Sequence, residues 1–191
     1  MLKSAAMPLP VQDVERELTH TRRVRFEGYK RADGLWDIEA HLSDIKNHDY
    51  HLKTGVRRAG QPIHEMWLRL TIDRNLTILD AAASMDALPY PGGCETIVPA
   101  YRKLIGLNLA KEFRKKVREI LGGTKGCTHL TEMLAGMPTA AIQTFAGERN
   151  EEQEGGMKPF QLDQCHALET STETVKKWYP KWYKRREEAS R

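Results

Sequence analysis

Apolar and polar residues alternate with a period of two through the first half of the chain, as in β-strands that bury one face. The alternation covers four segments, at Arg22–Glu27, Leu35–Leu42, Met66–Ile72 and Leu76–Ser84. Turn residues at Ala32–Gly34 and Asp73–Asn75 separate the first from the second and the third from the fourth. The polar residues 47–61 form a long loop between the two pairs. The pattern predicts an antiparallel meander of four strands.

The second half of the chain repeats apolar residues with helical spacing. The repeats predict three helices, at Ile97–Ile105, at Leu109–Leu121 and from Thr128 onward. Pro138 is expected to kink or break the third helix. Because the strands precede the helices instead of alternating with them, we expect an α+β fold, with an antiparallel sheet of about four strands and three helices on one face.

The two ends of the chain differ from this domain, which we place at residues 21–146. Residues 1–20 have the composition of an extended leader, and residues 147–157 that of an acidic, flexible linker. Residues 158–191 carry a cluster of large rings, Trp178, Tyr179, Trp182 and Tyr183. A free tail rarely carries so many aromatic residues. We therefore expect this segment to dock on the body or on a second chain, the latter giving a homodimer.

Composition excludes several classes of function. A net charge of +4 on 191 residues is too mild to indicate nucleic-acid binding. No apolar run approaches the roughly 18 residues of a membrane span, and Pro8 and Pro10 interrupt the N-terminal segment where a signal peptide would need its apolar core. We expect a cytoplasmic protein, in which thiols stay reduced.

The cysteines leave three interpretations open. Cys94 follows a glycine pair, and Cys127 lies in Gly-Cys-Thr-His-Leu, but the chain has no Cys-x2-Cys pair. Cys94, Cys127, His64 and His129 are candidate ligands of a Zn or Fe ion. The alternatives are buried structural cysteines and a catalytic thiol at Cys127. A functional thiol pair requires Cys127 to lie within about 6 Å of Cys94 or His64, whereas His129 is free to face elsewhere.

A second set of candidates follows the polar face of the second strand. Glu39 and His41 alternate with buried positions there, flanked by Asp37 and Asp44. Carboxylates and an imidazole that point into a pocket suit acid–base catalysis. Together with the thiol, the catalytic candidates are Glu39, His41, Tyr50, His64 and Cys127. The alternative for the strand face is a solvated sheet surface.

Longer motifs resemble a known family. The string Arg25-x-Glu27-Gly28-Tyr29, the segment from His64 to Arg69 and the segment Gly126–Glu132 are similar to an uncharacterised bacterial family, domain of unknown function 2889. The resemblance extends over nearly the whole chain and implies a protein of bacterial catabolism of aromatic, steroid or acyl compounds. A weaker similarity is to iron–sulfur scaffold proteins, in which a cysteine stands where this chain has Ile63-His64.

These observations favour an enzyme acting on a small, partly apolar metabolite, by an acid–base lyase or hydrolase reaction. The alternatives are a metal-binding or iron–sulfur scaffold-like protein that uses Cys94, Cys127 and a histidine, and an interaction module that docks through its aromatic tail. The sequence identifies neither the substrate nor the cofactor.

Overall fold

The computed structural model describes residues 9–10, 12–152 and 158–185. The chain divides into two compact units, Met1–Ala141 and Ile142–Arg191, and each is described by itself. Of the helices in the described ranges, none has the length and apolarity that crossing a membrane requires.

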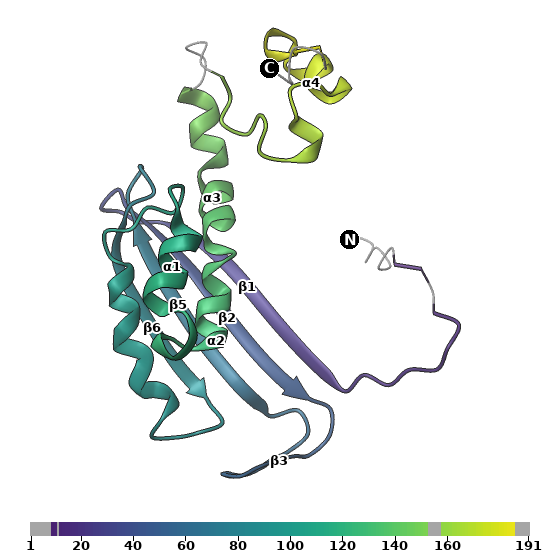
Figure 1. The fold of residues 1–191 in the computed structure, drawn as a ribbon, viewed down its shortest axis with the longest axis vertical. Helices are drawn as coiled ribbons and strands as arrows, with labels where there is room; N and C mark the ends of the chain where they lie inside the picture. Colours follow the sequence, from purple (N-terminus) through teal and green to yellow (C-terminus); the bar gives the residue numbers. More distant parts are fainter. Residues whose placement is uncertain (1–8, 11, 153–157, 186–191) are drawn as a thin grey trace. The chain divides into compact units, whose positions relative to one another are not determined.

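A four-stranded antiparallel sheet forms the centre of the first unit (Figure 1). Its strands are β1 (His20–Lys30), β2 (Trp36–Lys46), β5 (Pro62–Ile72) and β6 (Ile78–Ala87), and they pair in this order. The predicted meander is therefore confirmed. The loop between β2 and β5 contains a small hairpin, β3 (Tyr50–Leu52) with β4 (Gly55–Arg57). The alternation did not reveal this hairpin, because its strands are short and mostly exposed.

One face of the sheet carries the core of the unit. Ile38, Ala40 and Leu42 of β2 are buried, and so are Met66 and Leu68 opposite them on β5. Burying a large apolar side chain contributes roughly 1.5–3 kcal/mol, so this face determines which way the sheet packs. The residues between these positions, Glu39, His41 and Trp67, face the other side of the sheet.

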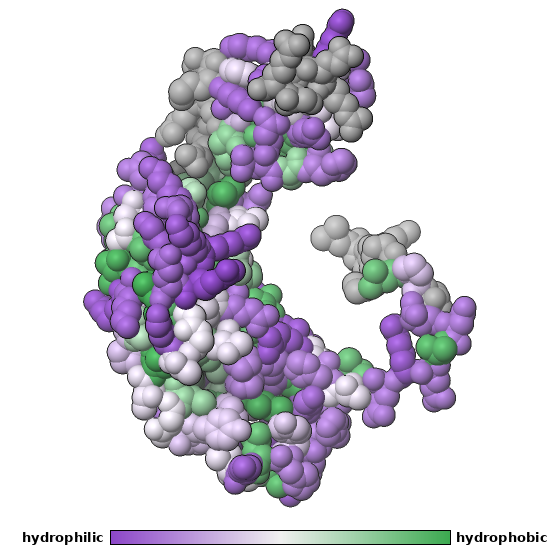
Figure 2. Space-filling view, viewed as in Figure 1, coloured by the Kyte–Doolittle hydropathy of each residue, from purple (hydrophilic) through white to green (hydrophobic). Residues whose placement is uncertain are grey.

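The helices of the first unit pack against the apolar face (Figure 1). They are α1 (Phe113–Leu121), α2 (Thr128–Leu134), the start of α3 (Met137–Glu152) and two 3-10 helices, η1 (Cys94–Leu104) and η2 (Gly123–Lys125). The exposed side of α1 is hydrophilic (Figure 2), because Arg114, Lys115 and Arg118 lie there.

All three helices differ from the prediction, and the second begins at Phe113 instead of Leu109. The first is a 3-10 helix, η1, which contains Pro99, a residue without the N–H that an α-helix needs. The third is divided into α2 and α3, and the break lies at Ala135 and Gly136, before Pro138. Pro138 lies in the first turn of α3, where its missing N–H has no partner to lose. A glycine suits the break, since a Cβ on Gly136 would lie 2.5 Å from Cζ of Phe26.

The second unit contains η4 (His166–Leu168), α4 (Glu173–Trp178) and η5 (Pro180–Trp182). It has its own small buried set, Leu162, Thr170 and Val175, while Trp178 is 67 % exposed. The aromatic segment therefore folds locally into short helices, and its docking on the body or on a second chain stays a prediction. Helix α3 extends to Glu152, into the segment for which a flexible linker was expected, and residues 153–157 lie outside the described residues.

Candidate functional site

Three neighbouring strands bring Arg22, Asp44 and His64 into one row. Arg22 of β1 is the register partner of Asp44 of β2, and Asp44 is the partner of His64 of β5. Cross-strand partners project to the same face of a sheet, and the next pair on this face, Leu42 and Met66, is fully buried. The row therefore points to the helix-covered side. The register shifts between Asp44 and Ile45, and such bulges are frequent next to functional sites.

The carboxylate of Asp44 is the centre of this row. Its Oδ1 accepts a hydrogen bond from Nε of Arg22 at 2.8 Å and lies 2.9 Å from Nε2 of His20. Its Oδ2 accepts from Nη2 of Arg22 at 2.9 Å and lies 3.0 Å from Nδ1 of His64. Burial by itself raises the pKa of this carboxyl group, but the hydrogen bonds and the charge of Arg22, with the contact to His20, lower the pKa to about 2. Asp44 is thus ionised at neutral pH.

The ionisation of Asp44 determines the tautomer of His64. An ionised carboxylate only accepts hydrogen bonds, so Nδ1 of His64 carries the proton that points to Asp44. In a neutral ring the other nitrogen, Nε2, then has a free lone pair. His64 has the fixed orientation and the free nitrogen of a base or of a metal ligand.

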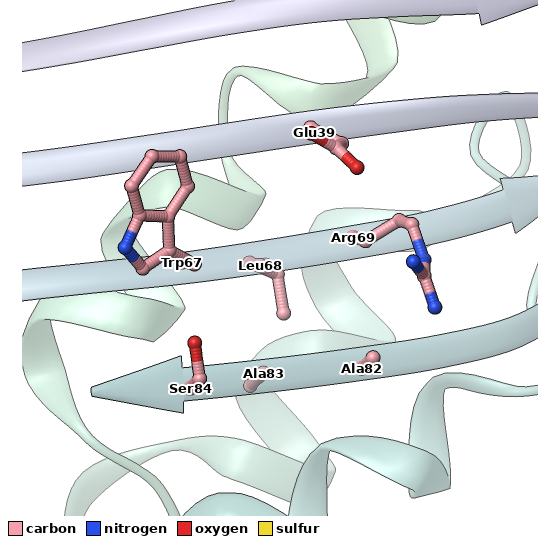
Figure 3. Close-up of a pocket in the computed structure, with 7 residues that line it drawn as sticks. All are labelled: Glu39, Trp67, Leu68, Arg69, Ala82, Ala83 and Ser84. Atoms are coloured by element: carbon pink, nitrogen blue, oxygen red, sulfur yellow. The ribbon is translucent and has the colours of Figure 1, made fainter. Parts of the chain in front are cut away.

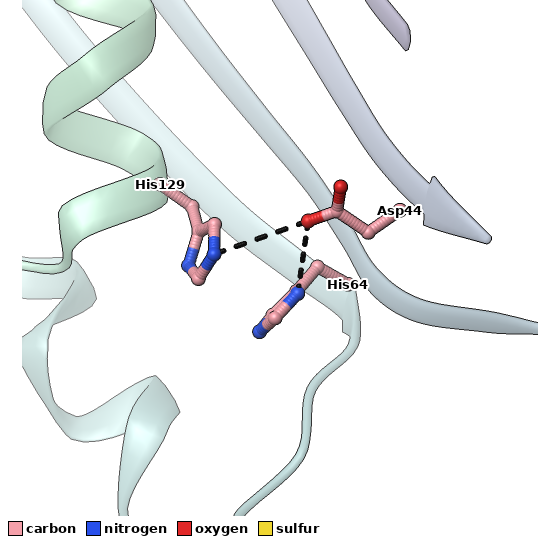
Figure 4. A group of neighbouring side chains, drawn as sticks. All are labelled: Asp44, His64 and His129. Atoms are coloured by element: carbon pink, nitrogen blue, oxygen red, sulfur yellow. Dashed lines mark hydrogen bonds and ion pairs between the residues drawn. The ribbon is translucent and has the colours of Figure 1, made fainter. Parts of the chain in front are cut away.

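Helix α2 closes the row from the other side. Nε2 of His129 lies 3.9 Å from Oδ2 of Asp44, and the imidazole ring of His129 lies over that of His64, with ring centroids 3.8 Å apart (Figure 4). One helical turn further, Glu132 accepts a hydrogen bond from Nη1 of Arg22 at 2.6 Å. Arg22 therefore joins two carboxylates, Asp44 and Glu132, while His20, His64 and His129 all contact the one carboxylate of Asp44.

His64 and His129 are both neutral at pH 7. Burial is the main cause that lowers the pKa of His64, and the neighbouring His129 lowers it further, against the opposing effect of Asp44. Burial, followed by the charge of Arg22, lowers the pKa of His129. The reference pKa of histidine is about 6.5, so a lowered value leaves both rings uncharged.

Cys127 lies directly before α2 and beside His129. Its Sγ lies 3.9 Å from Nδ1 of His129. The fully buried Tyr101 holds the peptide of Cys127, because the Tyr101 hydroxyl accepts from N–H of Cys127 at 3.0 Å. The same hydroxyl lies 3.0 Å from the Cys127 carbonyl oxygen and 2.8 Å from Oγ1 of Thr131. The half-exposed thiol of Cys127 is therefore attached to a backbone that Tyr101 holds in place.

The structure brings together three of the residues proposed from the sequence, His64, His129 and Cys127. His129 does not face elsewhere, because its ring lies against that of His64, tilted by 32°. Cys94 begins η1 and bonds through its backbone N–H to Tyr90. Within the described residues, the group with ligand atoms close enough for one ion is Asp44, His64 and His129, and neither Cys94 nor Cys127 belongs to it.

Glu39 and His41 lie on the other face of the sheet. His41 lies 2.9 Å from Oε1 of Glu65 and stacks on Trp67. Glu39 borders a shallow depression with Trp67 and Arg69 (Figure 3). The predicted catalytic residues therefore do not form one site. Glu39 and His41 point to the face of the sheet opposite Asp44 and His64, so they cannot share a pocket with His64.

Tyr50, the remaining catalytic candidate, lies in the small hairpin at the start of β3. Its side chain is exposed, and Nζ of Lys46 lies 5.6 Å from the centre of its ring. The contacts of Tyr50 therefore connect it to the end of β2 and not to the Asp44 row.

The central residue of the site, Asp44, appeared in the sequence only as a neighbour of the polar strand face. The signal that could have found it was the strand register, which aligns Asp44 with His64.

The group of Asp44, His64 and His129 has the donor set of a divalent metal site. Metal bonds of about 2.0–2.2 Å place neighbouring ligand atoms roughly 3–3.5 Å apart, and Oδ2 of Asp44 lies 3.0 Å from His64 Nδ1 and 3.9 Å from His129 Nε2. An ionised Asp44 and two neutral histidines carry the charges that ligands need, and a metal held through Nδ1 of His64 would require the ring proton on Nε2, opposite to the tautomer that bonds to Asp44. A cation bound here would share Asp44 with the guanidinium of Arg22, so the group could hold a metal or perform acid–base chemistry without one.

Comparisons with known proteins identify the family of the chain. No curated protein and no solved structure matches it. A family model does match, over residues 20–143, and it is described as DUF2889, protein of unknown function. The matched range includes every residue of the Asp44 row and of α2. Because this match covers well over half of the sequence, the chain belongs to the DUF2889 family.

Proposed function

We propose that the protein is an enzyme that acts on a small, partly apolar metabolite by a lyase or hydrolase reaction, with Asp44, His64 and His129 at its centre. One observation carries the proposal. A buried, ionised carboxylate fixes one nitrogen of His64 and leaves the other nitrogen of a neutral ring free. A positioned neutral imidazole is the commonest general base in enzymes.

Each residue has a role in this proposal. His64 accepts a proton from the substrate or from water through Nε2, and Asp44 stabilises the imidazolium that results. Arg22 keeps Asp44 ionised at every stage, because its guanidinium donates to both carboxylate oxygens. The side chains of His64 and His129 are 14 % and 23 % exposed, so a small molecule can reach them. The family likeness favours aromatic, steroid or acyl compounds as substrates.

The test is a set of activity assays with a matched pair of histidine variants. The substrates are aryl esters and acyl thioesters for hydrolysis, and β-hydroxy ketones for retro-aldol cleavage. His64→Gln and Asp44→Asn should lower kcat by roughly 10²–10⁴-fold. His41→Gln is the control, since His41 also has a carboxylate partner at 2.9 Å but lies on the opposite face of the sheet.

Equal losses in His64→Gln and His41→Gln would contradict the proposed site. The same conclusion follows if His64→Gln, correctly folded by circular dichroism, keeps the full wild-type kcat on a substrate that the enzyme turns over. Both outcomes are measurable on the full chain.

A second candidate function is metal binding, which the spacing of the three ligand atoms favours. Chelator-treated protein is titrated calorimetrically with Zn²⁺ or Fe²⁺, the iron under anaerobic conditions. One equivalent bound by wild type and by His41→Gln, and lost in His129→Ala, would support a metal site at Asp44, His64 and His129. Binding lost instead in Cys94→Ser would support the scaffold-like arrangement.

A further inference from the structure

We infer that Cys127 is a nucleophile that forms a thioester with the acyl group of an ester or thioester substrate, with His129 as its base. The inference deepens the proposed function, and rests on it, by naming the hydrolase class and the substrate class. The observations that carry it are the line of three side chains and the rigid support of the Cys127 peptide.

His129 lies between Cys127 and Asp44, and its two ring nitrogens each face one of them. Nδ1 of His129 lies 3.9 Å from Sγ of Cys127, and Nε2 lies 3.9 Å from Oδ2 of Asp44. With the proton on Nε2, facing the carboxylate, the lone pair of Nδ1 faces the thiol. A nucleophile, a base and a carboxylate that orients the base make the general arrangement of covalent catalysis. Such contacts are often long without substrate and shorten in the complex.

The backbone that presents the thiol is held from two sides. The hydroxyl of buried Tyr101 bonds to the N–H of Cys127 and lies within 3.0 Å of its carbonyl oxygen. A Cβ on Gly126 would lie 2.4 Å from the carbonyl oxygen of Leu121, so a side chain at this position would displace the backbone that leads to the thiol. The side chain of Cys127 remains half-buried, which leaves it open to a small molecule.

The reaction balances with water as the only co-reactant. The thiol proton of Cys127 passes to Nδ1 of His129 while sulfur bonds to the acyl carbon. The alkoxide or thiolate leaves with the proton that His129 returns to it. Water then attacks the thioester carbonyl and gives a proton to Nδ1 of His129. The carbon–sulfur bond breaks, and His129 passes this proton to Sγ, so the carboxylic acid leaves and the free thiol of Cys127 is restored. Asp44 is a positioning residue in this sequence, since it contacts His129 and not the acyl group.

The experiment follows acylation of the full chain directly. Chelator-treated protein is mixed with p-nitrophenyl acetate, released nitrophenolate is recorded, and the acetyl group is located by intact and peptide mass spectrometry. In samples quenched with acid during the first turnover, before water removes the acyl group, we expect one acetyl group per chain, on Cys127, in wild type and in Cys165→Ser, the variant at the exposed cysteine. Cys127→Ser should lose the acetylated cysteine peptide, and His129→Gln should acylate roughly 10²-fold more slowly.

Two results would overturn the inference. One is acetylation of Cys165 or Cys94 at a rate equal to that of Cys127. The other is an unchanged rate of Cys127 acylation in His129→Gln, which keeps the thiol and removes the base. The proposed function is judged separately: if His64→Gln abolishes turnover of a metabolite while Cys127 is never acylated, the acid–base enzyme stands and the nucleophile is excluded.

Discussion

The imidazole rings of His64 and His129 lie against each other, with centroids 3.8 Å apart and their planes tilted by 32°. One ring comes from the start of β5 and the other from α2, and both lie next to the same oxygen of Asp44. Two protonated rings at this distance would repel each other, and burial disfavours charge on either. The pair therefore combines a buried anion with two neutral bases, a combination that suits proton transfer or metal binding and that packing alone does not require.

Replacing Asp44 by asparagine should be strongly destabilising. The change removes the charge that compensates Arg22 inside the sheet, and breaking a largely buried pair from one side costs several kcal/mol. We expect the free energy of unfolding in urea to fall by about 2–3 kcal/mol. The control is Glu112→Gln, whose exposed pair with Lys115 should leave stability unchanged. Equal stability of Asp44→Asn and wild type would show that Asp44 does not neutralise Arg22.

Stability should decrease in two steps as the pH falls. His64 and His129 have lowered pKa values, so below about pH 6.5 the unfolded chain binds more protons than the folded one and stability declines. Asp44, with its pKa lowered from 3.8 to about 2, adds a further loss of about 2 kcal/mol between about pH 4 and pH 2. Urea midpoints measured along this range test both steps.

The control for the first step is the double variant His64→Gln/His129→Gln. Its urea midpoint should change less than that of wild type as the pH falls from about 6.5 to about 4.5. Identical profiles for the two proteins would mean that the buried histidines are not the groups that take up protons.

A methyl group on Gly126 should disturb the protein and its thiol together. The φ of Gly126 is −149°, which alanine can adopt, but its Cβ would meet the Leu121 carbonyl oxygen at 2.4 Å. The backbone must shift, at a cost of about 1–3 kcal/mol, and Cys127 moves with it. Gly126→Ala should therefore lower the melting temperature and slow alkylation of Cys127 by iodoacetamide. Gly93→Ala, with its nearest neighbour at 3.6 Å, should do neither.

The aromatic segment offers a test on the whole chain. Burying large rings stabilises by roughly 1.5–3 kcal/mol each, so a docked segment contributes measurably. Deleting residues 158–191 should lower the melting temperature of the remaining chain or convert a dimer into a monomer, as measured by calorimetry and by light scattering. If the melting temperature is unchanged and the mass per particle falls only by the mass of the deleted residues, the segment docks neither on the body nor on a second chain.

The alternation from Arg22 to Ser84 was sufficient to predict the four strands, their order and the buried faces of β2 and β5, because the period of two is a local property of a strand. Strand β1 buries no residue, and Val24 is 43 % exposed. Helical spacing likewise predicted α1 and α2. The 3-10 geometry of η1 and the position of the break before Pro138 were not predicted. Both depend on which hydrogen-bond partners single backbone N–H and C=O groups find in the packed unit.

The sequence by itself also named His64, His129 and Cys127 as candidate ligands or catalytic residues, from their residue types and, for Cys127, from the glycine before it. It did not reveal that Asp44 joins them. That relationship depends on the register, which aligns Arg22, Asp44 and His64 across three strands, and on the packing of α2, which adds His129. A shift of one residue in the register would turn Asp44 to the open face and His41 to the helix-covered face. Only the tertiary structure fixes this pairing, because the free energy that selects it comes from the many apolar contacts of the sheet and not from the polar residues themselves.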